Sequence, residues 1–225
     1  MLKSDPMMSL EGKSILITGG AGILGRQIVQ RLLGAGARVA IVDQSAEARA
    51  ALETLLIDHN TDPKSWQIHD TDITQLNALK ELQNQLSNDW GNMDVLINNA
   101  AANPYFGNVL DTGYEAMKKA VEVNVEGYFH MSQLAGQMMR EQQSGVIINT
   151  ASVNGIVPGW NQAIYSTSKA AIISMTQSFA KECAQFGIRV NAVLPGLTDT
   201  KFASALTQNP AMLKMILPQI PMARM

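Results

Sequence analysis

The sequence is poor in cysteine and in excess charge of either sign. Cys183 is the single cysteine among 225 residues, which excludes a disulfide within the chain and a thiolate-rich metal site. A lone thiol suits a reducing compartment, so we expect a cytoplasmic protein. Seventeen Lys and Arg against nineteen Asp and Glu give a net charge of −2, without a run of like charges. We therefore expect no face for nucleic acid or anionic lipid, and a small neutral partner is favoured.

Long hydrophobic runs and linkers are also lacking. The uninterrupted apolar stretches are a few residues long, well under the roughly 18 to 20 that cross a bilayer. Lys3 and Asp5 stand where a secretory leader has its apolar core, so neither a leader nor a membrane span is expected. The three histidines have no second ligand at metal spacing, so no metal site is predicted. Without a Pro/Ser-rich linker, a composition break or an internal repeat, residues 1–225 are predicted to form one domain.

Short apolar runs alternate along the chain with longer segments of helical period. The runs are apolar throughout rather than alternating, as expected of strands covered on both faces. The segments between them are long enough to cross back and begin a parallel neighbour, which predicts an α/β fold with a doubly wound parallel sheet. The predicted strands are Ser14–Thr18, Arg38–Val42, Trp66–Asp70, Asp94–Asn98, Val146–Thr150 and Arg189–Leu194, and the predicted helices are Leu24–Gly36, Ala46–His59, Gln75–Trp90, Tyr114–Gln142 and Ala163–Phe186.

A glycine-rich turn, Thr18–Gly25, joins the first strand to the first helix. Its glycines permit a tight turn and bring backbone N–H groups close to a pyrophosphate, and the helix N-terminus adds partial positive charge. The competing interpretation is a strand-to-helix turn that needs only flexible residues. Asp43 favours the phosphate site, because it ends the second strand 18 residues after Gly25, where a carboxylate accepts hydrogen bonds from an adenosine ribose and repels a 2′-phosphate. Since the turn contains no Lys or Arg, NAD is favoured over NADP.

Residues after the fifth strand are the candidates for acid–base chemistry. Ser152 follows that strand, and Tyr165 and Lys169 lie four residues apart on one face of the next helical segment. At roughly 5 Å and an effective dielectric near 20, an ammonium stabilises a phenolate by about 3 kcal/mol. We therefore expect Lys169 to lower the pKa of Tyr165 toward neutrality, as a general acid or base requires.

The Tyr-x-x-x-Lys pattern occurs a second time, from Tyr114 to Lys118. Ser152 stands thirteen residues before Tyr165, but the same offset from Tyr114 gives Ala101, which has no hydroxyl to orient a substrate oxygen. The second copy is therefore assigned to an ordinary helix surface.

Taken together, these motifs make the chain resemble the short-chain dehydrogenase/reductase family, in its shorter single-domain type, from about Gly12 to Met225. They occur in the family's order and spacing. The glycine spacing, T-G-x-x-G-x-x-G, is also found in larger members of the family. After the glycine turn come Asp72-Ile73, Asn98-Asn99-Ala100-Ala101, Asn124 within Val123–Gly127, Ser152, Tyr165, Lys169 and Pro195-Gly196.

The resemblance implies a Rossmann-like sheet with strand order 3-2-1-4-5-6 and a role for each matching residue. Tyr165 would donate or accept the proton, Lys169 would bind the nicotinamide ribose, and Ser152 would position the substrate oxygen. Asn124 would hold a water that links Lys169 to solvent. The implied cofactor-binding residues are Gly19, Gly22, Ile23, Leu24, Gly25, Asp43, Asp72, Ile73, Asn98, Ala100, Tyr165, Lys169, Pro195, Gly196, Leu197 and Thr200.

The function implied is the NAD-dependent interconversion of a secondary alcohol and a ketone. Two alternatives stay open: a nucleotide-binding regulator that kept the fold without turnover, and an S-adenosylmethionine-dependent methyltransferase, which also uses a glycine turn and an acidic residue after the second strand. The loop Val153–Ile164 mixes amide and apolar side chains. It fits a polyol, a β-keto ester and a mid-sized cyclic alcohol equally well.

A homo-oligomer is implied as well. In the family, one interface forms through the helices that hold Asn124 and Tyr165, and a second uses a strand and helix beyond the point corresponding to Pro221–Met225. We expect a dimer through those helices, and a tetramer if such a C-terminal tail is present. Without a further strand, Arg189–Leu194 would be an open edge of the sheet.

Overall fold

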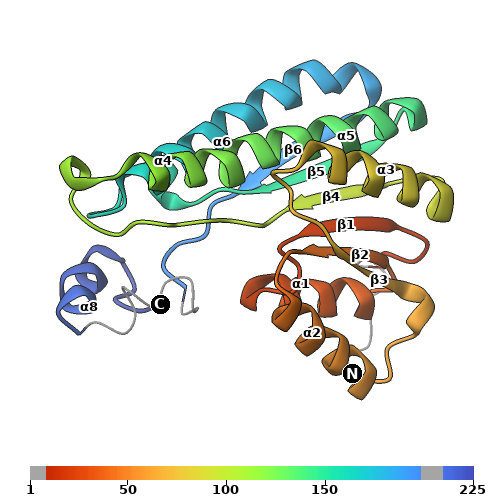
Figure 1. Ribbon diagram of the computed structural model, residues 1–225, viewed down its shortest axis with the longest axis horizontal. Coiled ribbons are helices and arrows are strands. Elements are labelled where there is room, and N and C mark those ends of the chain that lie inside the picture. The colour runs from red at the N-terminus through yellow and green to blue at the C-terminus, as the bar shows by residue number, and fades with distance from the viewer. Residues whose placement is uncertain (1–8, 199–209) are drawn as a thin grey trace.

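The computed structural model describes residues 9–198 and 210–225 (Figure 1). Its parallel sheet has the order β3-β2-β1-β4-β5-β6, which confirms the predicted doubly wound topology. The chain reverses direction across the sheet between β1 and β4, at the kind of switch point where such sheets bind ligands. The strands are β1 (Ser14–Thr18), β2 (Arg38–Asp43), β3 (Trp66–Asp70), β4 (Val95–Asn98), β5 (Gly145–Thr150) and β6 (Ile188–Val193).

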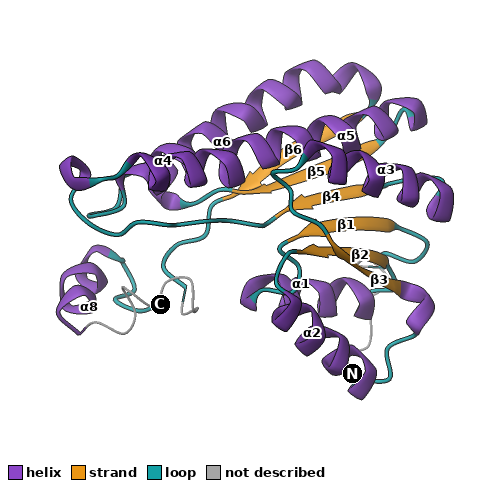
Figure 2. Ribbon diagram, in the orientation of Figure 1, coloured by secondary structure: helices purple, strands orange, loops and turns teal. Residues whose placement is uncertain are grey.

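Helices cover both faces of the sheet (Figure 2). One face carries α1 (Ile23–Gly34) and α2 (Ala46–Asp58), and the other carries α3 (Leu76–Trp90), α5 (Gly127–Gln142) and α6 (Ala163–Cys183). Successive side chains of β1 alternate between the two layers, because strand side chains have a period of two. Ile15 and Ile17 pack into the core on the α1–α2 side, whereas Leu16 packs into the core that includes α3 and α5.

The predicted helix Tyr114–Gln142 is interrupted. Helix α4 (Tyr114–Val121) is followed by a π-helical turn, Glu122–Glu126, before α5 begins. A π turn holds one more residue than an α turn, and such turns are frequent at functional sites. It places Asn124, which is completely buried, between the β4–α4 loop and α6.

The last described strand lies at one side of the sheet. Within residues 9–198 and 210–225, β6 pairs with β5 and with no second strand. Helix α8 (Pro210–Ile216) follows near the C-terminus. No helix within residues 9–198 and 210–225 combines the length and the apolarity needed to span a membrane.

Candidate active site

A large cavity of about 1930 Å³ lies at the carboxyl ends of the strands. Residues that follow each of the six strands line it, and Ile216, Ile220, Pro221 and Arg224 line it from the C-terminal segment. Its size exceeds the 300 to 1,000 Å³ usual for a single small ligand. Most of the predicted cofactor residues line this cavity: Gly19, Gly22, Ile23, Leu24, Gly25, Asp43, Asp72, Ile73, Ala100, Tyr165, Lys169, Pro195, Gly196 and Leu197. Thr200 lies outside the described residues.

The glycine turn is packed so closely that side chains are excluded from two of its positions. Gly19 has φ +62°, and a Cβ there would lie 2.7 Å from Ala100 Cα. A Cβ at Gly25 would collide with the carbonyl oxygen of Gly19. Gly22 caps α1 without a side-chain hydrogen bond. The first N–H groups of the helix are therefore available to an anion, as a pyrophosphate site requires.

Asn99, the second residue of the Asn98-Asn99-Ala100-Ala101 motif, holds the glycine turn in place. Its Nδ2 donates to the carbonyl oxygens of Thr18 (3.3 Å) and Gly19 (3.0 Å). In return, Thr18 Oγ1 accepts hydrogen bonds from the backbone N–H groups of Asn99 (3.0 Å) and Ala100 (3.1 Å). These bonds fix the glycine turn to the end of β4.

Among the predicted cofactor residues, Asn98 lies behind the cavity, and its cofactor contact stays a prediction. Asn98 is completely buried, and its Nδ2 donates to Ser132 Oγ (3.0 Å) and Asn149 Oδ1 (2.9 Å) instead of lining the cavity. The next residue, Asn99, follows the end of β4 and does line the cavity.

Asp43 faces the glycine turn with both carboxylate oxygens oriented by backbone donors. Oδ2 accepts a hydrogen bond from Ala21 N (3.2 Å) and Oδ1 accepts one from Ser45 N (3.0 Å). Behind it, Arg49 Nη1 donates to the Asp43 carbonyl oxygen (2.8 Å) and pairs with Asp70 Oδ1 (2.6 Å). Each carboxylate oxygen keeps a lone pair with which to accept a ligand hydroxyl.

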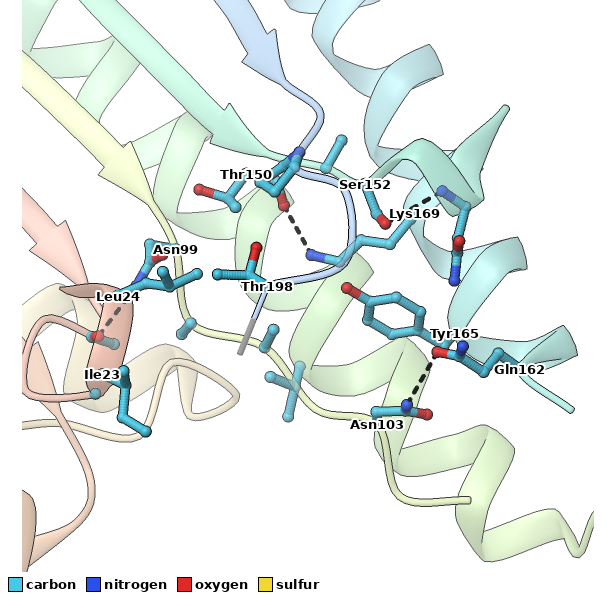
Figure 3. Close-up of a pocket in the computed structure, with 18 of the residues that line it drawn as sticks. Ile23, Leu24, Asn99, Asn103, Thr150, Ser152, Gln162, Tyr165, Lys169 and Thr198 are labelled. Atoms are coloured by element: carbon cyan, nitrogen blue, oxygen red, sulfur yellow. Dashed lines mark hydrogen bonds between the residues drawn. The ribbon is translucent and has the colours of Figure 1, made fainter. Parts of the chain in front are cut away.

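Ser152, Tyr165 and Lys169 converge at the other end of the cavity (Figure 3). Ser152 caps the short turn Val153–Gly155, and its Oγ accepts a hydrogen bond from Asn154 N (3.2 Å). The Tyr165 side chain is hydrogen-bonded to Ser152. Lys169 is 1% exposed, and its Nζ donates to the Thr150 carbonyl oxygen (2.7 Å) and lies 5.6 Å from the centre of the Tyr165 ring.

The expectation that Lys169 lowers the pKa of Tyr165 is not met. Burial raises the pKa of Tyr165, and the hydrogen bond from Ser152 offsets this only in part. Burial also lowers the pKa of Lys169 to about 7, because the ammonium loses hydration. The Lys169 Nζ is held by the Thr150 carbonyl oxygen.

Asn124 lies behind the cavity and does not line it. Its Oδ1 accepts from Ala102 N (2.8 Å), and its Nδ2 donates to Ala102 O (2.8 Å) and Ser168 Oγ (2.9 Å). The amide thus joins the β4–α4 loop to α6 one residue before Lys169. Its geometry is that of a positioning residue, and the water that the resemblance implies stays a prediction.

Tyr128 and the Thr150 carbonyl complete the surroundings of Lys169. Tyr128 is completely buried, its hydroxyl donates to Thr150 O (3.3 Å), and its ring centre lies 5.3 Å from Lys169 Nζ. The sequence could have indicated Tyr128, because it stands four residues after Asn124 in the predicted helix, and residues at that spacing share a helix face. The Thr150 carbonyl could not have been found in this way, because every residue has a backbone carbonyl.

In the described ranges no cluster of three or more His, Cys, Asp or Glu side chains is arranged to hold a metal ion.

The match to a known family decides what this architecture is. The family model for short chain dehydrogenase matches residues 13–211. The chain belongs to the short-chain dehydrogenase family. This membership removes the methyltransferase alternative, and the expected family resemblance is confirmed.

Curated relatives of this short-chain dehydrogenase include oxidoreductases and dehydrogenases. An "Uncharacterized oxidoreductase" of Thermotoga maritima is 34% identical over 222 residues, which cover 97% of this chain and 86% of the relative. The 3alpha-hydroxysteroid dehydrogenase of Mediterraneibacter gnavus is also 34% identical, over 226 residues that cover 96% of this chain and 85% of the relative.

Solved structures with the same fold contain either nicotinamide dinucleotide. NAD+-bound xylitol dehydrogenase is similar with a TM-score of 0.87 and 29% identity, covering 95% of this chain and 86% of that one. ElxO with NADP bound is similar with a TM-score of 0.83 and 26% identity, covering 95% and 85%.

Proposed function

We propose that this short-chain dehydrogenase is an NAD-dependent oxidoreductase that interconverts a secondary alcohol and a ketone, with Tyr165 as the general acid and base. One observation carries the proposal. The hydrogen-bonded pair of Ser152 and Tyr165, with Lys169 beside it, lines the same cavity as the glycine turn and Asp43. A dinucleotide site and a proton-transfer site therefore share one space.

The residues present fit a nicotinamide dinucleotide. The exclusion of side chains at Gly19 and Gly25 and the uncapped start of α1 suit a pyrophosphate, and the oriented carboxylate of Asp43 suits an adenosine ribose. When bound, the nicotinamide supplies or accepts the hydride. The absence of a Lys or Arg from the glycine turn, together with Asp43, supports NAD over NADP.

The chain's own residues supply orientation and proton transfer. The Ser152 hydroxyl is placed to donate a hydrogen bond to the substrate oxygen, and Tyr165 Oη takes the alcohol proton during oxidation and returns it during reduction. Lys169, held by Thr150, is placed to bind ribose hydroxyls and to stabilise the phenolate as it forms. Asn124 supports the geometry by fixing α6 beside Lys169.

Cofactor titration followed by a substrate panel tests the proposal. We expect NADH to bind more tightly than NADPH, and a panel of secondary alcohols and ketones to produce an absorbance change at the nicotinamide band. Binding without turnover of any panel member would instead support the regulator alternative. Failure to bind either nucleotide would exclude both functions.

A dimer through α4, α5 and α6 is proposed as the functional assembly. Phe129 on α5 is 43% exposed and Met117 on α4 is 52% exposed. The Phe129 ring meets Phe179 of α6 edge-on at 5.5 Å, so apolar side chains extend across neighbouring helices. Light scattering is expected to give twice the chain mass of 24.4 kDa, and Phe129→Glu to give the single mass. A monomeric wild-type protein at micromolar concentration would argue against this interface.

A further inference from the structure

Three carboxamide side chains beside Tyr165 differ from the other buried amides of the fold. Asn154, Asn161 and Gln162 line the cavity, Gln162 is 8% exposed, and the two asparagines are half-buried. Among the described residues, the side chains of Asn154 and Asn161 have no hydrogen-bond partner, and Gln162 Oε1 makes one contact of 3.5 Å with Asn103 Nδ2. Of the other amides, five that are buried or half-buried bond to the protein, namely Asn98, Asn99, Asn124, Gln142 and Asn149.

The amide nitrogens of Asn154 and Gln162 lie close together beside Gly159. If Gly159 carried a Cβ, it would stand 2.7 Å from Asn154 Nδ2 and 3.1 Å from Gln162 Nε2. The Asn154 and Gln162 amides therefore pack against Gly159 on the side where a side chain would stand, and a Cβ there would displace them. Gln162 also lies three residues before Tyr165, which places it one turn away on the same face.

The backbone around Gly159 is fixed. Asn161 adopts a left-handed conformation with φ +57°, which non-glycine residues rarely adopt. Its carbonyl oxygen accepts a hydrogen bond from Gly107 N (3.0 Å), and Gly159 N donates to Ser166 Oγ (3.2 Å). The loop before α6 is thus tied both to the β4–α4 loop and to α6, and it presents the amides in a preformed arrangement.

We propose that Asn154, Asn161 and Gln162 form a subsite for hydroxyl groups on the carbons next to the one oxidised, so the substrate class is polyhydroxylated alcohols and the corresponding ketoses. The proposal rests on the proposed function, since it places the reacting carbinol at Tyr165. It selects the polyol from the three substrate classes that the sequence leaves open.

A neutral hydroxyl matches the chemistry of this subsite. Each carboxamide offers both N–H donors and an oxygen acceptor, and a hydroxyl likewise donates and accepts. A cyclic hydrocarbon such as a steroid ring would leave these half-buried amides without partners, at a cost of about 1–3 kcal/mol for each group. The exposed apolar side chains, Ile156, Val157 and Trp160, are more exposed than the amides. Hydroxyl-bearing carbons are thereby favoured in the part of the cavity next to Tyr165.

Four-carbon alcohols that differ only in hydroxyl number test the proposal. The kcat/KM for oxidation is measured for 2-butanol, 2,3-butanediol and erythritol with the nucleotide that binds. We expect erythritol to exceed 2-butanol by at least about 100-fold, because a site built for hydroxyls rejects analogues that lack them. Gly159→Ala puts a methyl group too close to the Asn154 and Gln162 amides, so it displaces them and is expected to reduce this ratio to below about tenfold. Gly34→Ala, where a Cβ meets nothing within 4 Å, is the matched control and keeps the wild-type ratio.

Asn154→Leu provides a second variant if circular dichroism shows that Gly159→Ala does not fold. It removes one amide at similar side-chain volume, and the same fall in the ratio is expected. Equal kcat/KM values for erythritol and 2-butanol in the wild type would overturn the subsite, and so would a ratio that both variants leave unchanged. Oxidation of larger apolar alcohols without erythritol would overturn the subsite and leave the proposed function standing. No turnover of any alcohol or ketone would overturn both.

Discussion

Tyr165→Phe is expected to lower kcat/KM by about 10²- to 10⁴-fold in both directions, the range for loss of a general acid or base. The phenyl ring keeps the shape of the side chain and removes only Oη, so the affinity for NADH is expected to change by less than about threefold. A Tyr165→Phe variant that binds NADH but does not turn over substrate would show that the phenol oxygen serves proton transfer and is not needed for cofactor binding. The measurement is steady-state kinetics with fluorescence titration of NADH.

Tyr114→Phe is the matched control, because Tyr114 begins the other Tyr-x-x-x-Lys pattern. Tyr114 is 75% exposed, and Lys118 of that copy pairs with Glu122 (3.8 Å) on the helix surface. This substitution is expected to leave turnover unchanged. Retained activity in Tyr165→Phe would mean that another group transfers the proton.

The dependence of turnover on pH provides a second test of Tyr165 as the general acid and base. Oxidation needs the Tyr165 phenolate, and burial raises the pKa of Tyr165, so oxidation is expected to rise with pH through the alkaline range. Reduction needs the protonated phenol, which is fully populated at neutral pH. The alkaline rise in oxidation is expected to vanish in Tyr165→Phe.

Local patterns were sufficient to predict the sheet and most of the cavity lining. The apolar runs are strands because both of their faces are covered, and the glycine turn is recognisable because a Cβ at Gly19 or Gly25 has no room. The family resemblance named Asn98, whose side chain is buried against Ser132 and Asn149. Asn99, one residue later, is the one that reaches the glycine turn.

Features that depend on several segments were beyond sequence reasoning. The pKa of Tyr165 depends on how deeply α6 buries the phenol, which the spacing to Lys169 does not report. The π turn at Glu122–Glu126 has no local signature within a continuous helical period. The packing of the Asn154 and Gln162 amides against Gly159 depends on how the loop before α6 folds, which the sequence does not report.

Asp43→Ala is expected to reverse the preference for NAD over NADP. The carboxylate oxygens, oriented by Ala21 N and Ser45 N, are placed to accept ribose hydroxyls, and a hydrogen bond to a charged group contributes about 1.5–3 kcal/mol. Loss of this hydrogen bond is expected to weaken NAD binding by about 10- to 150-fold. NADP binding is expected to strengthen, because the repulsion of a 2′-phosphate disappears and the Arg49 guanidinium stays beside the Asp43 carbonyl oxygen.

Asp70→Asn separates the role of Asp43 from a general effect of charge. It removes the ionic partner of Arg49 and leaves the Asp43 carboxylate in place, so the Kd for NADH is expected to stay within about twofold of the wild type. NADPH is expected to bind somewhat more tightly, since the Arg49 guanidinium is less neutralised. Titration of both reduced cofactors against the two variants measures this, and an unaltered preference in Asp43→Ala would show that the ribose contact lies elsewhere. Because Arg49 contacts the backbone of Asp43 rather than its side chain, both variants keep that basic group in place, and the carboxylate is what selects the nucleotide.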